Sequence, residues 1–195
     1  MIKYIIVGVV VVLLGVAVFT GDSLNKGAGQ AQPGTSFDAL VGRPASDFTL
    51  TSYDGKDYTL SQLKGKKVIL FFNEGLMCYP ACWNQIAALG TDEQLNSGDV
   101  VALSIVGDAR DGWREAIDRM PDLGKGTILL DSDKSVSRQY DMLNLPSSMH
   151  SGMLPGHTFV LVDEKGIVRY TFDDPKMGNR NDMLLKEIKK MEEAS

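Results

Sequence analysis

An uninterrupted apolar run, Val68–Phe72, places this chain among the α/β proteins. A strand without polar alternation is buried on both faces, which requires a sheet covered on each side. Beyond it, Cys82, Ile86 and Leu89 recur at helical spacing. The chain's two cysteines, Cys78 and Cys82, therefore fall in a strand-to-helix turn. Such a turn carries reactive atoms to the rim of a sheet, where the start of the helix stabilises a thiolate.

The N-terminal segment differs from the rest because residues 4–21 carry no charge. As a helix, these roughly 18 residues span about 27 Å, close to the hydrocarbon core of about 30 Å. We predict a transmembrane anchor, or an uncleaved signal, over residues 1–21. A cleaved signal peptide is the alternative, although no small-x-small site follows the apolar run. Lys3 precedes the run, so the positive-inside tendency places the following domain on the extracytoplasmic side of a single-pass membrane protein.

Composition divides the remainder into a linker and a domain. Residues 22–36 are rich in Gly, Ser, Gln and Pro and predict a flexible linker. The folded domain is expected over residues 37–195. A net charge of −5, spread along the chain, argues against a nucleic-acid partner.

Strand and helix patterns alternate through the domain. A hairpin around an Asp-Gly turn comes first, and Gly90 is expected to end the helix that carries Cys82. The expected strands are 48–50, 58–60, 68–72, 100–106, 127–130, 158–162 and 167–172, and the later helices 112–120, 134–140 and 181–193. This order predicts a thioredoxin-like fold, in which helices flank both faces of a central mixed β-sheet and an N-terminal β-hairpin is added.

Several segments resemble the AhpC/TSA and TlpA-like redoxins. They are GRPASDFTL at 42–50, DGK at 54–56, LSQLKGK at 60–66, FVLVD at 159–163 and KG at 165–166. The resemblance covers nearly all of residues 37–195. It implies a thiol-disulfide oxidoreductase with antioxidant or redox activity at Cys78 and Cys82, which the anchor would place outside the cytoplasm. Because Cys78 lies nearer the loop, we expect it to attack and Cys82 to resolve, whereas a peroxiredoxin-like register would reverse these roles. The resemblance implies no cofactor, and a protein thiol or disulfide, or a membrane electron donor, as partner. Redoxins of this class usually have two residues between the cysteines, whereas this chain has three.

A second resemblance is to the peroxiredoxins. Tyr79-Pro80-Ala81-Cys82 lies over their Thr-Pro-x-Cys segment. In this register Tyr79 replaces the family's hydroxyl residue and Gly75 replaces its proline. We therefore rank thiol peroxidase activity below the other interpretations.

A third resemblance is to copper-binding proteins of the SCO type. These carry Cys-x3-Cys in the same loop and a histidine before the late strand, which Cys78, Cys82 and His157 match. Two thiolates and an imidazole suit copper, and the thiolates favour Cu(I). The copper-binding alternative therefore assigns these three residues as ligands.

The flanking residues have simpler interpretations beside functional ones. Glu74 is a candidate proton relay to a thiol or a solvated loop carboxylate. Trp83 is expected to pack over the cysteine loop, and Tyr79 and Pro80 to shape the turn. The cysteine pair itself has two plain alternatives, a static structural disulfide or, for Cys82, a core residue.

Overall fold

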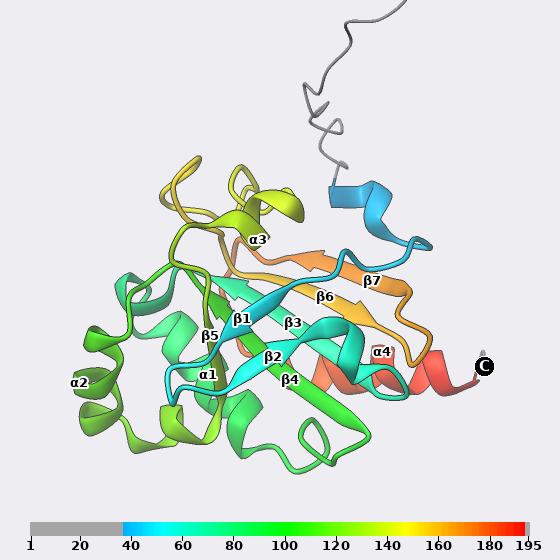
Figure 1. The fold of residues 1–195 in the computed structure, drawn as a ribbon, viewed down its shortest axis with the longest axis horizontal. Helices are drawn as coiled ribbons and strands as arrows, with labels where there is room; N and C mark the ends of the chain where they lie inside the picture. Colours follow the sequence, from blue (N-terminus) through cyan, green and yellow to red (C-terminus); the bar gives the residue numbers. More distant parts are fainter. Residues whose placement is uncertain (1–36, 194–195) are drawn as a thin grey trace, which may run out of the picture. The chain divides into compact units, whose positions relative to one another are not determined.

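The computed structural model describes residues 37–193, which form a five-stranded mixed sheet with helices packed on it (Figure 1). The strand order is β5-β4-β3-β6-β7. Central β3 runs parallel to β4 and antiparallel to β6, while β5 and β7 form the edges. The strands are β3 (Lys67–Asn73), β4 (Val100–Val106), β5 (Thr127–Leu130), β6 (Thr158–Val162) and β7 (Val168–Asp173).

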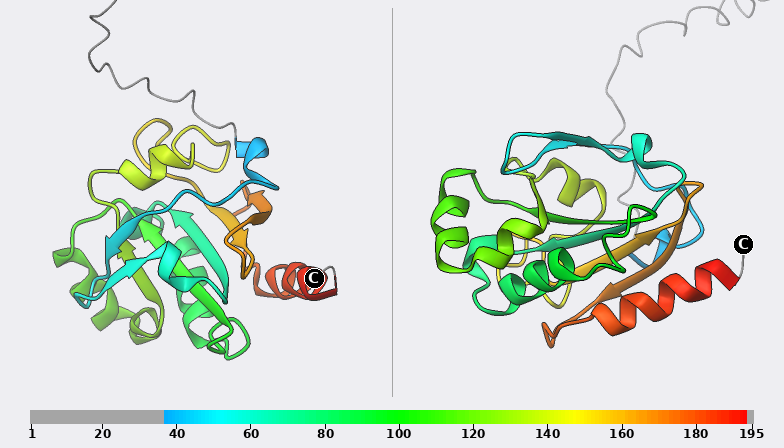
Figure 2. Two further views of the ribbon diagram at one scale, coloured as in Figure 1. Left: turned by 45° about the vertical axis from the view of Figure 1, so that its right-hand side comes forward. Right: turned by 90° about the horizontal axis from the view of Figure 1, so that it is seen from below.

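Side chains of β3 alternate between two cores. Ile69 and Phe71 pack with the helices α1 (Ala81–Thr91), α2 (Asp111–Arg119) and α4 (Asn181–Glu193). Leu70 and Phe72 pack on the opposite face, beneath the hairpin of β1 (Thr49–Thr51) and β2 (Asp57–Thr59) and the short helix α3 (Ser135–Gln139). The right-hand view of Figure 2 shows the hairpin on one side of the sheet and α1 and α4 on the other. Four 3₁₀ turns complete the part of the chain that the structure describes. They are η1 (Phe37–Leu40), η2 (Leu60–Leu63), η3 (Gly75–Met77) and η4 (Pro121–Lys125).

The expected thioredoxin-like architecture is confirmed for the domain. The strands at 100–106, 127–130 and 158–162 and the helix at 181–193 have the predicted bounds, and the other elements agree within about two residues. The predicted hairpin forms its own two-stranded sheet, in which Thr49 pairs with Thr59. Gly55 in its turn has a φ of +91°, a conformation that glycine adopts at low cost.

The prediction that Gly90 ends its helix is wrong. Helix α1 continues to Thr91, and Gly90 instead packs against the backbone of η4 and the residue after it. A Cβ at this position would lie 2.4 Å from the backbone nitrogen of Gly126. Gly90 therefore permits a close approach of two chain segments rather than a helix stop.

The predicted membrane anchor and linker, residues 1–21 and 22–36, lie outside the described residues. Between Phe37 and Glu193 no helix is long and apolar enough to cross a membrane. The anchor and the extracytoplasmic location of the domain stay predictions.

Candidate active site

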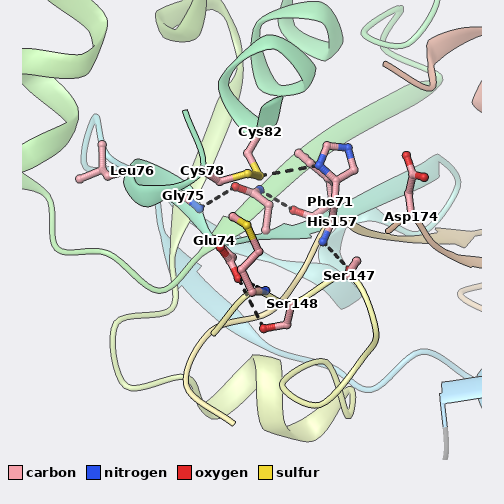
Figure 3. Close-up of a disulfide and its surroundings, with 12 residues drawn as sticks. Phe71, Glu74, Gly75, Leu76, Cys78, Cys82, Ser147, Ser148, His157 and Asp174 are labelled. Carbon is pink, nitrogen blue, oxygen red and sulfur yellow. Dashed lines mark hydrogen bonds between the residues drawn. A yellow bond between two sulfur atoms is a disulfide. The ribbon is translucent and has the colours of Figure 1, made fainter. Parts of the chain in front are cut away.

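Cys78 and Cys82 form a disulfide at the carboxyl end of β3 (Figure 3). Cys78 ends the η3 turn, and Cys82 lies in the first turn of α1, with their Cα atoms 5.3 Å apart. The Cys82 amide donates to the Cys78 carbonyl, which fixes the turn. Both cysteines are buried, at 2% and 0% exposure. The fold thus brings the predicted pair together at the rim of the sheet.

Two polar side chains from neighbouring strand ends hold this turn. The Gly75 amide donates to Asn73 Oδ1 at 2.9 Å, and the Leu76 amide donates to Asp108 Oδ2 at 3.0 Å. Gly75 has a φ of +62°, and a Cβ there would lie 1.7 Å from Asp108 Oδ2. Burial raises the pKa of Asp108, although the Leu76 amide opposes this effect. Sequence reasoning did not single out Asp108, whose role depends on the parallel alignment of β3 and β4.

His157 lies against the cysteine pair although it is far along the sequence. Its Nδ1 atom is 3.7 Å from Cys82 Sγ, the contact drawn as a dashed line in Figure 3. The backbone amide of His157 donates to Ser147 Oγ at 2.7 Å, and the ring packs edge-on against Phe71 at 4.7 Å. The other ring nitrogen, Nε2, is buried without a hydrogen-bond partner in the described part of the chain.

The environment of His157 keeps its imidazole neutral. Burial lowers the pKa of His157 to about 4, against the opposing effects of the Asp174 carboxylate and the Gly178 backbone. Arg180 acts in the same direction as burial. A neutral imidazole has one N–H donor and one acceptor nitrogen, so it can donate to a thiolate or accept from a thiol.

The depressed pKa of His157 predicts a pH dependence of stability. Between its ordinary value of 6.5 and about 4, the unfolded state binds a proton that the folded state does not. The contribution of the neutral imidazole to the free energy of unfolding should be fully present above pH 6.5. It should be lost as the pH falls through this window, at about 1.4 kcal/mol per pH unit and about 3 kcal/mol in total. His157→Gln should lose this component.

Denaturant unfolding of the oxidised protein at about pH 7 and about pH 4 provides the measurement. The carboxylates titrate in both proteins, so the difference between wild type and variant isolates the imidazole. Equal losses of stability in the two proteins would show that His157 titrates normally.

The donor atoms of the copper hypothesis also converge. The sulfur atoms of Cys78 and Cys82 and a ring nitrogen of His157 all lie within 4.8 Å of one another, and all three residues are buried. Two sulfurs and an imidazole form a soft donor set that fits Cu(I) once the disulfide is reduced. Met149 and Met153, also soft donors, are exposed at the surface.

Glu74 is fully buried, so its interpretation as a solvated loop carboxylate is wrong. Its Oε1 accepts hydrogen bonds from the backbone amides of Met149 and His150 at 2.6 and 3.0 Å. Its Oε2 lies 3.1 Å from His150 Nδ1. Ser148 Oγ adds a weaker contact at 3.4 Å. These partners come from the segment 147–154, which lies beside the cysteine turn (Figure 3). Glu74 therefore ties this segment to the end of β3.

The aromatic residues beside the cysteines form one cluster. Trp83 is buried in the core, and its ring contacts that of Tyr79, in the cysteine turn, edge-on at 5.0 Å. Tyr79 is 59% exposed. Pro80 is the N-cap of α1, in agreement with a role in shaping the turn, and its peptide bond to Tyr79 is cis. The guanidinium of Arg119, which sequence reasoning missed, lies over both rings.

The thioredoxin-like fold and a cysteine pair at the carboxyl end of β3 define a redoxin. Residues 41–171 match the AhpC/TSA family, and the chain belongs to that family.

Peroxiredoxins are among the similar proteins. Peroxiredoxin Bcp from Escherichia coli is 27% identical over 151 residues, which are 76% of this chain and 95% of that protein. The chloroplastic peroxiredoxin Q of Triticum aestivum is 30% identical over 136 residues, but the match spans only 56% of that protein and 66% of this chain. A reduced 2-Cys peroxiredoxin from Plasmodium vivax shares the fold, with a TM-score of 0.67 at 24% identity, covering 80% of this chain and 98% of that structure.

Proposed function

We propose that this protein is a thiol-disulfide oxidoreductase whose Cys78 and Cys82 cycle between dithiol and disulfide. The observation that carries the proposal is the pair itself, joined at the rim of the sheet with His157 Nδ1 3.7 Å from Cys82 Sγ. Membership of the AhpC/TSA family and similarity to peroxiredoxins support redox chemistry at this site. The chemistry needs no cofactor, since sulfur atoms carry the electrons.

The surroundings of the two sulfurs support different roles for them. Cys82 lies at the start of α1 and beside the neutral imidazole of His157, and both features stabilise a thiolate. A stabilised thiolate is the better leaving group in disulfide exchange. A partner thiolate therefore attacks Cys78 Sγ, and the S–S bond breaks toward Cys82.

A second partner thiolate completes the cycle. It attacks the partner sulfur of the mixed disulfide and releases Cys78 as a thiolate. Two partner thiols thus become one disulfide, and the protein pair gains two electrons and two protons. The reverse direction reduces a partner disulfide, with Cys78 as the attacking sulfur and Cys82 as the resolving one.

The surface near Cys78 favours a protein-sized partner. Cys78 stands between Met77 and Tyr79, which are 61% and 59% exposed. Its sulfur is buried, but the residues on either side of it are at the surface. A partner that binds to these two side chains contacts the residues on both sides of Cys78, which places its own sulfur close to this cysteine.

Thiol peroxidase activity is the second candidate, and the names of the relatives favour it. In that reaction the Cys82 thiolate attacks one oxygen of hydrogen peroxide, the O–O bond breaks, and the other oxygen leaves as hydroxide, which is protonated to water. The resulting Cys82 sulfenic acid condenses with the Cys78 thiol to give the disulfide and a second water. The residues that flank the cysteines favour the peroxidase reaction less than thiol-disulfide exchange. The exposed Tyr79 ring packs against the buried Trp83, and within the described residues no hydrogen bond joins Tyr79 to Cys82.

A direct competition distinguishes these two reactions. The fully reduced protein is mixed with hydrogen peroxide or with an equal concentration of a protein disulfide, and the loss of free thiols is followed. We expect faster oxidation by the protein disulfide. Faster oxidation by peroxide would overturn the exchange proposal and support the peroxidase.

Copper binding through Cys78, Cys82 and His157 is the third candidate, favoured by the convergence of their donor atoms. An anaerobic Cu(I) competition titration of the reduced protein tests it, with His157→Ala as the matched variant. If the site binds copper, one equivalent is held tightly and the variant holds it less tightly. Equal affinities in both proteins would assign the binding to an ordinary dithiol.

A further inference from the structure

Arg119, at the end of α2, lies beside the cysteine turn. Its guanidinium carbon is 5.7 Å from the centre of the Tyr79 ring and 5.6 Å from that of Trp83. The two rings meet edge-on with an interplanar angle of 76°. Cation–π attraction to both rings therefore fixes the position of this positive charge.

The hydrogen-bonding capacity of this guanidinium is unused. Within residues 37–193, the Arg119 guanidinium forms neither an ion pair nor a hydrogen bond, although Asp122, three residues further on, pairs with Lys125. Arginine has five N–H donors in a planar fork that matches a carboxylate. A cation in the last turn of a helix is favoured by the helix dipole, but this effect does not require stacking on two rings.

The location of the guanidinium links it to the redox pair. Tyr79 directly follows Cys78, whose sulfur we propose as the one that the partner thiolate attacks. Trp83 directly follows Cys82. The same segment that carries both cysteines thus holds the cation in place. An anion bound to Arg119 would therefore lie beside the side chain of Tyr79, the residue that follows Cys78.

We propose that Arg119, held on Tyr79 and Trp83, selects thiol partners that carry a carboxylate beside their cysteine. The inference rests on the proposed exchange function and names its substrate class. The partner carboxylate accepts hydrogen bonds from the guanidinium while the partner thiolate attacks Cys78 Sγ. The Cys78–Cys82 bond breaks as the mixed disulfide forms, and a second partner thiol then releases the partner as a disulfide.

Three peptides test the proposal on the oxidised full-length protein. They share the sequence acetyl-Gly-Cys-Xaa-Gly-amide, with Glu, Gln or Lys as Xaa. The rate of protein thiol formation is measured by quenched alkylation and mass analysis. An exposed ion pair increases the rate for the Glu peptide over the Gln peptide by about fivefold, and the Lys peptide is slowest. Added salt reduces this preference.

Variants assign the preference to one residue. Arg119→Gln should bring the Glu-to-Gln rate ratio close to one, and Arg119→Lys should keep part of it because the charge remains. Arg114→Gln is the matched control, an exposed arginine of the same helix, and should retain the wild-type ratio.

Two results would overturn the inference. Equal rates for the Glu and Gln peptides in the wild type, or a preference that survives in Arg119→Gln, would contradict it and leave the exchange function intact. Failure of every peptide to reduce the disulfide would overturn both this inference and the exchange function.

Discussion

Cys82→Ser is expected to trap the reduced protein as a mixed disulfide with its partner. Cys78 can still attack a partner disulfide, but no second thiol remains to release the product. Turnover should therefore fall to the uncatalysed background while a covalent adduct accumulates. Non-reducing electrophoresis and intact mass show the adduct directly.

Cys78→Ser provides the matched variant. The remaining thiol, Cys82, lies between the half-buried Ala81 and the buried Trp83, whereas the neighbours of Cys78 are exposed, so we expect equally low turnover without a stable adduct. An adduct in Cys78→Ser and none in Cys82→Ser would reverse the roles that we assign to the two sulfurs.

Glu74→Ala is expected to cause a large loss of stability. The substitution leaves the Met149 amide without its acceptor, leaves the His150 amide only its 3.2 Å bond to Ser148 Oγ, and removes the contact to His150 Nδ1. Because unsatisfied buried donors are costly, we expect the free energy of unfolding to fall by about 3 kcal/mol or more. Denaturant unfolding of the oxidised protein measures the change.

Two milder substitutions separate the contributions to this effect. Glu74→Gln keeps an oxygen acceptor for the two amides and should lose less than Glu74→Ala. His150→Gln removes the imidazole alone and should have the smallest effect. If Glu74→Ala and His150→Gln were equally mild, the segment 147–154 would be held by contacts other than this carboxylate.

Much of the domain could be predicted because its signals are local. Val68–Phe72 is apolar throughout, and the structure buries β3 between two cores. The turn of the hairpin likewise depends on the backbone preferences of its own residues, Asp54 and Gly55. These features do not require knowledge of distant segments.

The residues that sequence reasoning missed or interpreted wrongly depend on distant segments. Glu74 follows an apolar strand and reads as a loop carboxylate, but the amides that surround it come from Met149 and His150. Arg119 resembles any exposed helix cation until α2 is placed beside α1. Gly90 is a residue type that often ends helices, yet the glycine is required here because the backbone of Gly126 approaches closely. The spacing of residues along the chain does not predict these contacts between distant segments.

His157 is an intermediate case. Its place before the late strand was predicted from family resemblance, and the structure brings it to Cys82 Sγ through the pairing of β3 with β6. Its neutral state required the structure, since burial is what lowers its pKa.

Redox titration of the Cys78–Cys82 pair tests the central claim most directly. The native protein is equilibrated with mixtures of reduced and oxidised glutathione, and the thiols are trapped by alkylation and counted by mass. Near-UV circular dichroism follows the fold in the same samples. We predict one reversible two-electron transition between oxidised and reduced states that are both folded. Reduction that occurs only together with loss of the near-UV signal would identify a static structural disulfide and contradict the account.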